Sequence, residues 1–245
     1  MRSLAEMVPA VTVVNEGGAA PLVLVCEHAS NHIPARFNAL GLPPEELQRH
    51  IAWDIGAAAL AGRLAALLDA PLFLSGYSRL LIDCNRPPGV PSSIPVRSEA
   101  TDIPDNQGLT AAEIAQRQDD YFWPFQHRIA RFLDARPTRF LLGVHSFTPV
   151  FHGAPRPWQA GVLYGEATGF GAALIAGLRQ DPALTVGDNE PYRIELAEDY
   201  TVPVHGDARG IPAALIEVRQ DLLADPAGIE AWAQRLAPIL AQAMR

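Results

Sequence analysis

The sequence predicts an α/β fold in which one mostly parallel sheet carries helices on both faces. Short apolar runs alternate with longer segments of helical periodicity along most of the chain. The apolar runs show little polar alternation, which is typical of strands that are buried on both faces. The chain has 245 residues, 49% of them hydrophobic, which is enough to bury such a sheet. We therefore expect residues 1–245 to form a single domain.

The elements follow one another in the order that this fold requires. Six apolar runs bounded by turn or polar residues are predicted strands: 21–26, 72–75, 80–83, 140–144, 161–164 and 213–218. Four segments with apolar residues at helical spacing are predicted helices: 55–68, 111–134, 171–178 and 229–244. The proline- and serine-rich segment 87–104 predicts a long ordered loop over the sheet edge. The acidic segment 181–207 is a candidate lid over the crevice.

Composition excludes several classes of function. The formal net charge is -8, which argues against nucleic acid as a partner. All 19 basic residues are arginine, so Schiff-base chemistry and Walker-type phosphate loops are excluded. No apolar run approaches the ~18 residues that a membrane span needs, and the first residues lack the apolar core of a secretory signal. We expect a cytoplasmic protein with no membrane partner, in which Cys26 and Cys84 are buried reduced thiols.

Two histidines lie where predicted strands end. His28 comes two residues after the run 21–26, and His145 directly follows the run 140–144. Ligands of open α/β sheets bind beyond the carboxyl ends of the strands, so we expect both imidazoles to face one crevice. Histidine is the commonest metal ligand in proteins, and the pair predicts hydrolytic metal chemistry. The alternative is structural: a loop position for His28, and for His145 a buried ring bonded to a neighbouring carbonyl.

Asp54 immediately precedes the predicted helix 55–68. An aspartate there is expected to cap the helix by accepting hydrogen bonds from its first free amides. The functional alternative makes Asp54 the third ligand of a zinc ion held by the two histidines. Such a site leaves one coordination position open for water.

Charged residues beside two predicted strands are candidates for substrate binding and proton transfer. Arg79 and Arg86 flank the run 80–83 and suit a substrate carboxylate, or they form structural ion pairs with Asp83. Glu217 lies inside the apolar run 213–218, where an unpaired carboxylate is rarely buried. Beside an activated water it would act as base and then as acid. The alternative is an ion pair with Arg219, two residues along the same strand face.

Several motifs together resemble the N-formylglutamate amidohydrolase family over roughly residues 21–223. They occur in the order and at the spacing of that family. The motifs are Glu27-His28-Ala29-Ser30-Asn31, Trp53-Asp54, Ser78-Arg79 through Asp83-Cys84-Asn85-Arg86-Pro87, Val144-His145-Ser146, Asn189-Glu190-Pro191-Tyr192, and His205-Gly206 leading to Glu217.

The resemblance implies a zinc carboxypeptidase or phosphorylase/hydrolase-like architecture. It implies zinc-dependent hydrolysis of a short N-acyl amino acid, with N-formyl-L-glutamate of histidine degradation as the first candidate. His28, His145 and Asp54 would hold the zinc. Glu27 is the second candidate for the third position, because the acid that distant relatives use falls on Asn31 in this sequence. By position, Glu217 matches the general base.

The resemblance also implies how a small acidic substrate would be bound. Arg86, together with Asn85 and Arg79, would hold its carboxylates, with Asn31 as a further contact. His205 would steady the oxyanion or dock the substrate, and a lid histidine without such a role is the alternative. Two rival functions remain: hydrolysis of another N-acyl amino acid or small peptide, and non-catalytic binding of a small anion. The sequence does not predict the oligomeric state.

Overall fold

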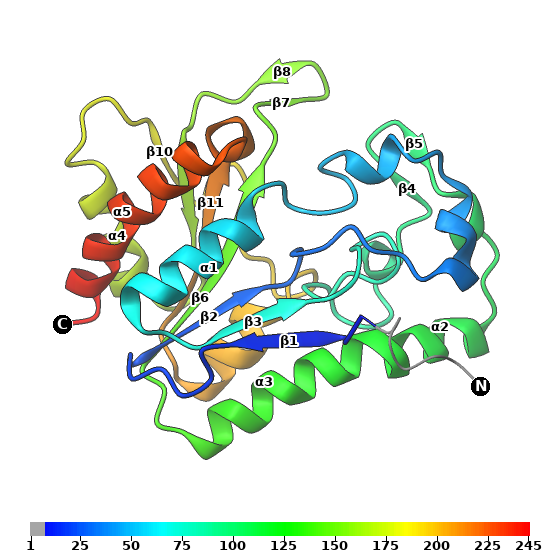
Figure 1. Cartoon of the computed structure of the whole chain (residues 1–245), viewed down its shortest axis with the longest axis horizontal. Helices are drawn as coiled ribbons and strands as arrows, with labels where there is room; N and C mark the ends of the chain where they lie inside the picture. Colours follow the sequence, from blue (N-terminus) through cyan, green and yellow to red (C-terminus); the bar gives the residue numbers. More distant parts are fainter. Residues whose placement is uncertain (1–7) are drawn as a thin grey trace.

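A computed structural model of the whole chain describes residues 8–245, and a seven-stranded sheet runs through its middle (Figure 1). The strand order is β1-β3-β2-β6-β11-β9-β10. β3, β2, β6 and β11 are parallel, β1 is antiparallel to β3, and β9 and β10 run antiparallel to β11. The predicted α/β fold with a mostly parallel sheet is confirmed. The strands are β1 (Val11–Val14), β2 (Leu22–Cys26), β3 (Leu72–Ser75), β6 (Phe140–Phe147), β9 (Ala160–Leu163), β10 (Val186–Asp188) and β11 (Ala213–Arg219).

Helices cover both faces of the sheet. One core cluster joins the sheet to α1 (Ala57–Leu68), α4 (Thr168–Leu178) and α5 (Pro226–Ala243). A second cluster joins the opposite face to α3 (Trp123–Ala135). α2 (Ala111–Arg117) leads into α3 through a π-helical turn, and Figure 1 shows this long unit on the side of the sheet away from α5. Two small hairpins lie outside the sheet: β4 (Arg97–Ser98) with β5 (Thr101–Asp102), and β7 (Val150–Phe151) with β8 (Ala154–Pro155).

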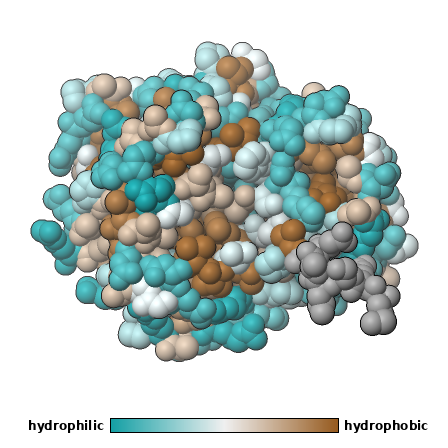
Figure 2. Space-filling model, viewed as in Figure 1, coloured by the Kyte–Doolittle hydropathy of each residue, from teal (hydrophilic) through white to brown (hydrophobic). Residues whose placement is uncertain are grey.

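The described residues bury apolar side chains in these two clusters and in a third, which contains Leu80, Leu81 and Ile82. Figure 2 shows hydrophilic residues around most of the periphery of one face, with apolar residues gathered near its centre. Among residues 8–245, no helix is both long enough and apolar enough to cross a membrane.

The sheet register brings site residues from different strands onto one face. His145 of β6 is paired in parallel register with Glu217 of β11. Cα partners in neighbouring strands point to the same face, so both side chains lie on the α3 side, near the carboxyl ends of their strands. Gly143 leaves room for Leu215 and His145 on this face, because a Cβ there would lie 2.2 Å from Leu215 Cδ2 and 3.4 Å from Nε2 of His145.

The structure corrects several predicted elements. The run 80–83 is not a strand: its residues are buried, but the carbonyl oxygens of Leu80 and Leu81 accept hydrogen bonds from side chains, from Asn106 at 2.8 Å and Arg117 at 3.0 Å. The strands β1 and β10 were not predicted, and the helix 111–134 is interrupted by the π-helical turn Gln118–Phe122. The segment 181–207 is not one loop, because it contains β10 and a second π-helical turn, Thr201–Gly206.

Candidate active site

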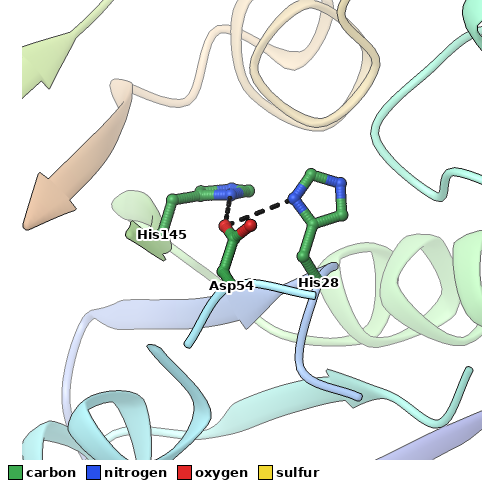
Figure 3. Close-up of side chains that lie close together, drawn as sticks. All are labelled: His28, Asp54 and His145. Atoms are coloured by element: carbon green, nitrogen blue, oxygen red, sulfur yellow. Dashed lines mark hydrogen bonds and ion pairs between the residues drawn. The ribbon is translucent and has the colours of Figure 1, made fainter. Parts of the chain in front are cut away.

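Two imidazoles and one carboxylate meet at the carboxyl edge of the parallel strands (Figure 3). His28 comes from the turn after β2, Asp54 from the loop before α1, and His145 from β6. One oxygen of Asp54, Oδ2, lies 3.3 Å from Nδ1 of His28 and 2.8 Å from Nδ1 of His145. One potential ligand atom from each residue lies within 4.8 Å of the others, and all three side chains are buried. The sequence expectation that the two histidines face one crevice is therefore met.

The second nitrogen of each imidazole faces another buried carboxylate. Nε2 of His28 lies 2.8 Å from Oδ1 of Asp83. Nε2 of His145 lies 3.1 Å from Oε2 of Glu27, as an ion pair without the alignment of a hydrogen bond. Carboxylates behind histidine ligands fix the tautomer and the ring orientation in metal sites. This arrangement leaves both Nδ1 atoms directed at Asp54.

Asp54 does not cap α1, so the structural alternative predicted for it is wrong. No side chain of residues 8–245 caps this helix, and the N-cap position is Gly56, at a positive φ of 81°. The main chain of Asp54 is fixed by an N–H donated to the carbonyl of His28 at 3.0 Å. Its side chain turns to the histidines and also accepts the backbone N–H of Ser146 at 3.3 Å. The local fold thus directs this carboxylate into the site.

Electrostatics favour positive charge at this point. Burial acts to raise the pKa of Asp54, but the two histidines outweigh it and hold the pKa below its usual range. Burial acts to lower the pKa of His28 and of His145, and the surrounding carboxylates raise both, that of His145 well above its usual value. In the metal-free protein the two imidazoles therefore take up the positive charge that the carboxylates require.

Glu217 lies beside this group with an unpaired oxygen. Its side chain is 6% exposed, and Oε2 has no hydrogen-bond partner among the described residues. Burial raises its pKa from 4.5 to about 7, opposed by His145. The alternative considered for Glu217, an ion pair with Arg219, is absent, because that guanidinium binds Asp221 at 2.8 Å. A buried carboxyl group with a pKa near neutrality is suited to both accept and donate a proton.

These side chains open into a cleft of about 860 Å³. Its walls come from the sheet edge, the segment 91–99 and the segment 189–199. Four arginines line it, together with a larger number of carboxylates. The arginines are Arg79, Arg86, Arg97 and Arg193.

Comparison with known proteins gives the family. The family model described as N-formylglutamate amidohydrolase matches residues 20–224. The chain belongs to the N-formylglutamate amidohydrolase family. A search of curated proteins gave no match.

Two solved structures share the fold over almost the whole chain. The gene product Atu2144 from Agrobacterium tumefaciens is 37% identical, with a TM-score of 0.92 over 96% of this chain and 95% of that one. The N-formylglutamate amidohydrolase from Ralstonia eutropha JMP134 is 20% identical, with a TM-score of 0.70 over 97% of both chains. Family membership supports an amidohydrolase, an enzyme that hydrolyses an amide bond.

The structure brings some of the expected substrate-binding residues of this amidohydrolase to the cleft. Arg79 lines it and pairs with Asp83 at 2.8 Å and Asp54 at 3.6 Å, so its charge also balances the site. Arg86 lines the cleft and pairs at 2.7 Å with Asp199 instead of Asp83.

Asn85 lines the cleft with its amide engaged within the fold. Its Nδ2 donates to Asp199 at 3.3 Å, and its Oδ1 accepts the N–H of Thr201 at 3.0 Å. These bonds fix the segment 199–201 beside Arg86.

Two expected site residues of the amidohydrolase lie outside the cleft lining. The side chain of Asn31 donates to the carbonyl of Leu47 at 2.8 Å. The ring of His205 bonds through Nε2 to Oε1 of Gln126 at 2.7 Å, and its Nδ1 has no partner among the described residues. Burial lowers the pKa of His205 to about 4, so the ring is neutral. The structure does not bring either side chain to the two histidines.

Sequence reasoning missed two carboxylates that shape this site. From the sequence, Asp83 is considered only as a partner for arginines, because it lies 55 residues from His28 in the chain and no local pattern links the two. Asp199 gave no signal, because its partner Arg86 lies 113 residues away in the chain.

Proposed function

We propose that this protein is a metal-dependent amidohydrolase that cleaves the amide bond of a short N-acyl amino acid, with N-formyl-L-glutamate as the first candidate. The observation that carries the proposal is the convergence of the Nδ1 atoms of His28 and His145 on one Asp54 oxygen, beside the unpaired carboxyl group of Glu217. Hydrolysis of N-formyl-L-glutamate would give formate and L-glutamate and place the enzyme in histidine degradation.

The donor set fits a divalent cation such as zinc. Two imidazole nitrogens and a carboxylate oxygen are the ligands that catalytic zinc sites use. Four buried carboxylates surround the rings, and among the described residues Arg79 is the only arginine paired with any of them. These carboxylates are Glu27, Asp54, Asp83 and Glu217. Their excess negative charge supports a cation held by His28, His145 and Asp54.

A cation at this position supplies Lewis-acid chemistry, polarising the amide carbonyl and making water more acidic. Glu217 is the residue of this chain that moves protons. Its carboxylate takes a proton from the attacking water, and the resulting carboxylic acid gives that proton to the departing amine nitrogen. Its raised pKa suits both steps, because neither protonation state is strongly favoured near neutral pH. The sheet register holds it beside His145 throughout.

The walls of the cleft position the substrate. Arg79 and Arg86 present guanidinium groups to the cleft, and each is held in place by a carboxylate. Binding the substrate in one orientation places its amide bond at the reacting groups and lowers the entropic part of the barrier.

Release assays test the substrate. The purified enzyme is given N-formyl-L-glutamate, N-acetyl-L-glutamate and N-formyl-L-alanine, and the free amino acid is measured. We expect the highest kcat/KM with N-formyl-L-glutamate, and a lower value in the Glu217→Gln variant by roughly 10²- to 10⁴-fold. Equal turnover by Glu217→Gln and the wild type would contradict the assigned role of Glu217.

The size of the cleft supports a second candidate substrate class. A volume of about 860 Å³ lies in the upper part of the range for small-molecule sites and exceeds the needs of one formylated amino acid. A longer N-acyl amino acid or a small acylated peptide would fill it better. Higher kcat/KM with longer acyl groups in the same assay would favour this class.

A further inference from the structure

The segment after β10 carries the motif Asn189–Tyr192, which the proposed mechanism leaves without a role. The segment packs directly on β9. Asn189 donates its backbone N–H to the carbonyl of Val162 at 2.9 Å. A Cβ on Gly161 would lie 1.8 Å from the carbonyl oxygen of Glu190, so only glycine permits this approach. These contacts hold Asn189 and Glu190 against β9, and Tyr192, two residues further on, lines the cleft.

Arg156 lies behind Tyr192 in a cage of aromatic rings. Its Nη1 donates to the hydroxyl oxygen of Tyr192 at 2.8 Å. Its guanidinium carbon lies 4.5 Å from the ring centroid of Phe151, 4.7 Å from that of Tyr192 and 5.7 Å from that of Phe147. Within residues 8–245, no carboxylate forms an ion pair with Arg156. Its positive charge is thus held beside the cleft without a neutralising partner.

This arrangement leaves the Tyr192 hydroxyl with a proton to donate. The oxygen accepts from Arg156, and in the described part of the chain the hydroxyl donates to no other group. The side chain is 42% exposed and lines the cleft. Arg193, the next residue, also lines the cleft and has no ion pair among the described residues. Arg79 and Arg86, in contrast, already have carboxylate partners.

We propose that Tyr192 and Arg193 form the subsite that binds a carboxylate of the substrate, with Arg156 as a positioning residue behind Tyr192. The inference rests on the proposed function, since it assumes a substrate that carries a carboxylate. A tyrosine hydroxyl and a free guanidinium both make strong, charge-assisted hydrogen bonds to carboxylate oxygens. The subsite is separate from the one at Arg86 that the family resemblance implies.

Binding of glutarate, a dicarboxylate, tests the subsite without turnover, and its neutral diamide glutaramide is the matched probe. Calorimetry compares the wild type with Tyr192→Phe and Arg193→Gln. We expect each substitution to weaken glutarate binding roughly tenfold, the size of one charge-assisted hydrogen bond, and to leave glutaramide binding unchanged. Arg131→Gln is the control, because Arg131 is an exposed arginine on α3 without an ion pair in the described chain.

A double-mutant cycle tests the positioning role of Arg156. Arg156→Met should weaken glutarate binding in the wild-type background and have little further effect in Tyr192→Phe, because the charge acts through the hydroxyl. Arg156→Lys should restore part of the loss. Equal effects of Arg156→Met in both backgrounds would show a merely structural residue.

Glu190→Gln removes a carboxylate that also lines the cleft, and it should strengthen glutarate binding.

The outcomes separate this inference from the proposed function. The inference is overturned if the wild type does not prefer glutarate to glutaramide, or if only Arg86→Gln weakens glutarate while Tyr192→Phe and Arg193→Gln bind normally. If N-formyl-L-glutamate is not hydrolysed but the two variants still lose glutarate binding, the subsite is supported and the proposed substrate fails.

Discussion

Replacing Glu217 with glutamine should stabilise the metal-free protein while it lowers the catalytic efficiency. Burial raises the pKa of Glu217 from 4.5 to about 7, so the folded state binds this proton more tightly than the unfolded state does. Each pKa unit corresponds to about 1.4 kcal/mol, and the shift therefore costs about 3 kcal/mol of stability when Glu217 is ionised. The protonated form of Glu217 avoids this cost, so the protein keeps its full stability below pH 4.5 and loses about 3 kcal/mol of it as the pH rises through 7.

Urea denaturation of chelator-treated protein at several pH values between 5 and 8 measures this effect. The free energy of unfolding of the wild type should fall with rising pH relative to that of Glu217→Gln, and the difference should reach about 1–3 kcal/mol at pH 8 once the cost of burying an amide is subtracted. Glu45→Gln is the control, because Glu45 is an exposed carboxylate. Parallel stability curves for the wild type and Glu217→Gln would refute the reasoning that Glu217 is a destabilised, functional carboxylate.

Two further predictions concern groups behind the site. Asp83→Asn should weaken zinc binding by roughly 10- to 100-fold, measured by competition with a chelator, because the carboxylate 2.8 Å from His28 orients that ring; unchanged affinity would contradict this role. His205→Gln should flatten the acid side of the stability curve. Burial lowers the pKa of His205 from 6.5 to about 4, so the free energy of unfolding falls by about 3 kcal/mol through this group as the pH falls from 6.5 to 4. His205→Gln should lack this fall in urea denaturation. A variant whose stability falls with pH as steeply as that of the wild type would refute the assignment.

The sequence predicted those features that depend on local pattern. The strands β2, β3, β6, β9 and β11 are continuous apolar runs bounded by turn or polar residues, and those runs identified them. The run 80–83 gave the same signal and is not a strand, because its carbonyls bond to side chains distant in sequence. β1 and β10 were missed, because these edge strands are partly exposed and lack the buried apolar run that marks β3 and β9.

The candidate site also shows what local sequence pattern does and does not predict. His28 and His145 could be found because each follows or ends an apolar run. For Asp54 the local rule favoured a helix cap, and only the tertiary position of His28 and His145 shows that its carboxylate faces two imidazoles. Asn31 and His205 were included through family resemblance, yet their side chains bond to Leu47 and Gln126. Side-chain direction depends on packing, which the motif alone does not contain.

Metal analysis of protein purified without chelator tests the central claim most directly, namely that His28, Asp54 and His145 bind one divalent cation. The wild type and the control His127→Ala, altered at an exposed histidine on α3, should contain close to one ion per chain after zinc is supplied, and His145→Ala should contain almost none. Full metal content in His145→Ala, or a wild type that takes up no metal, would contradict the account.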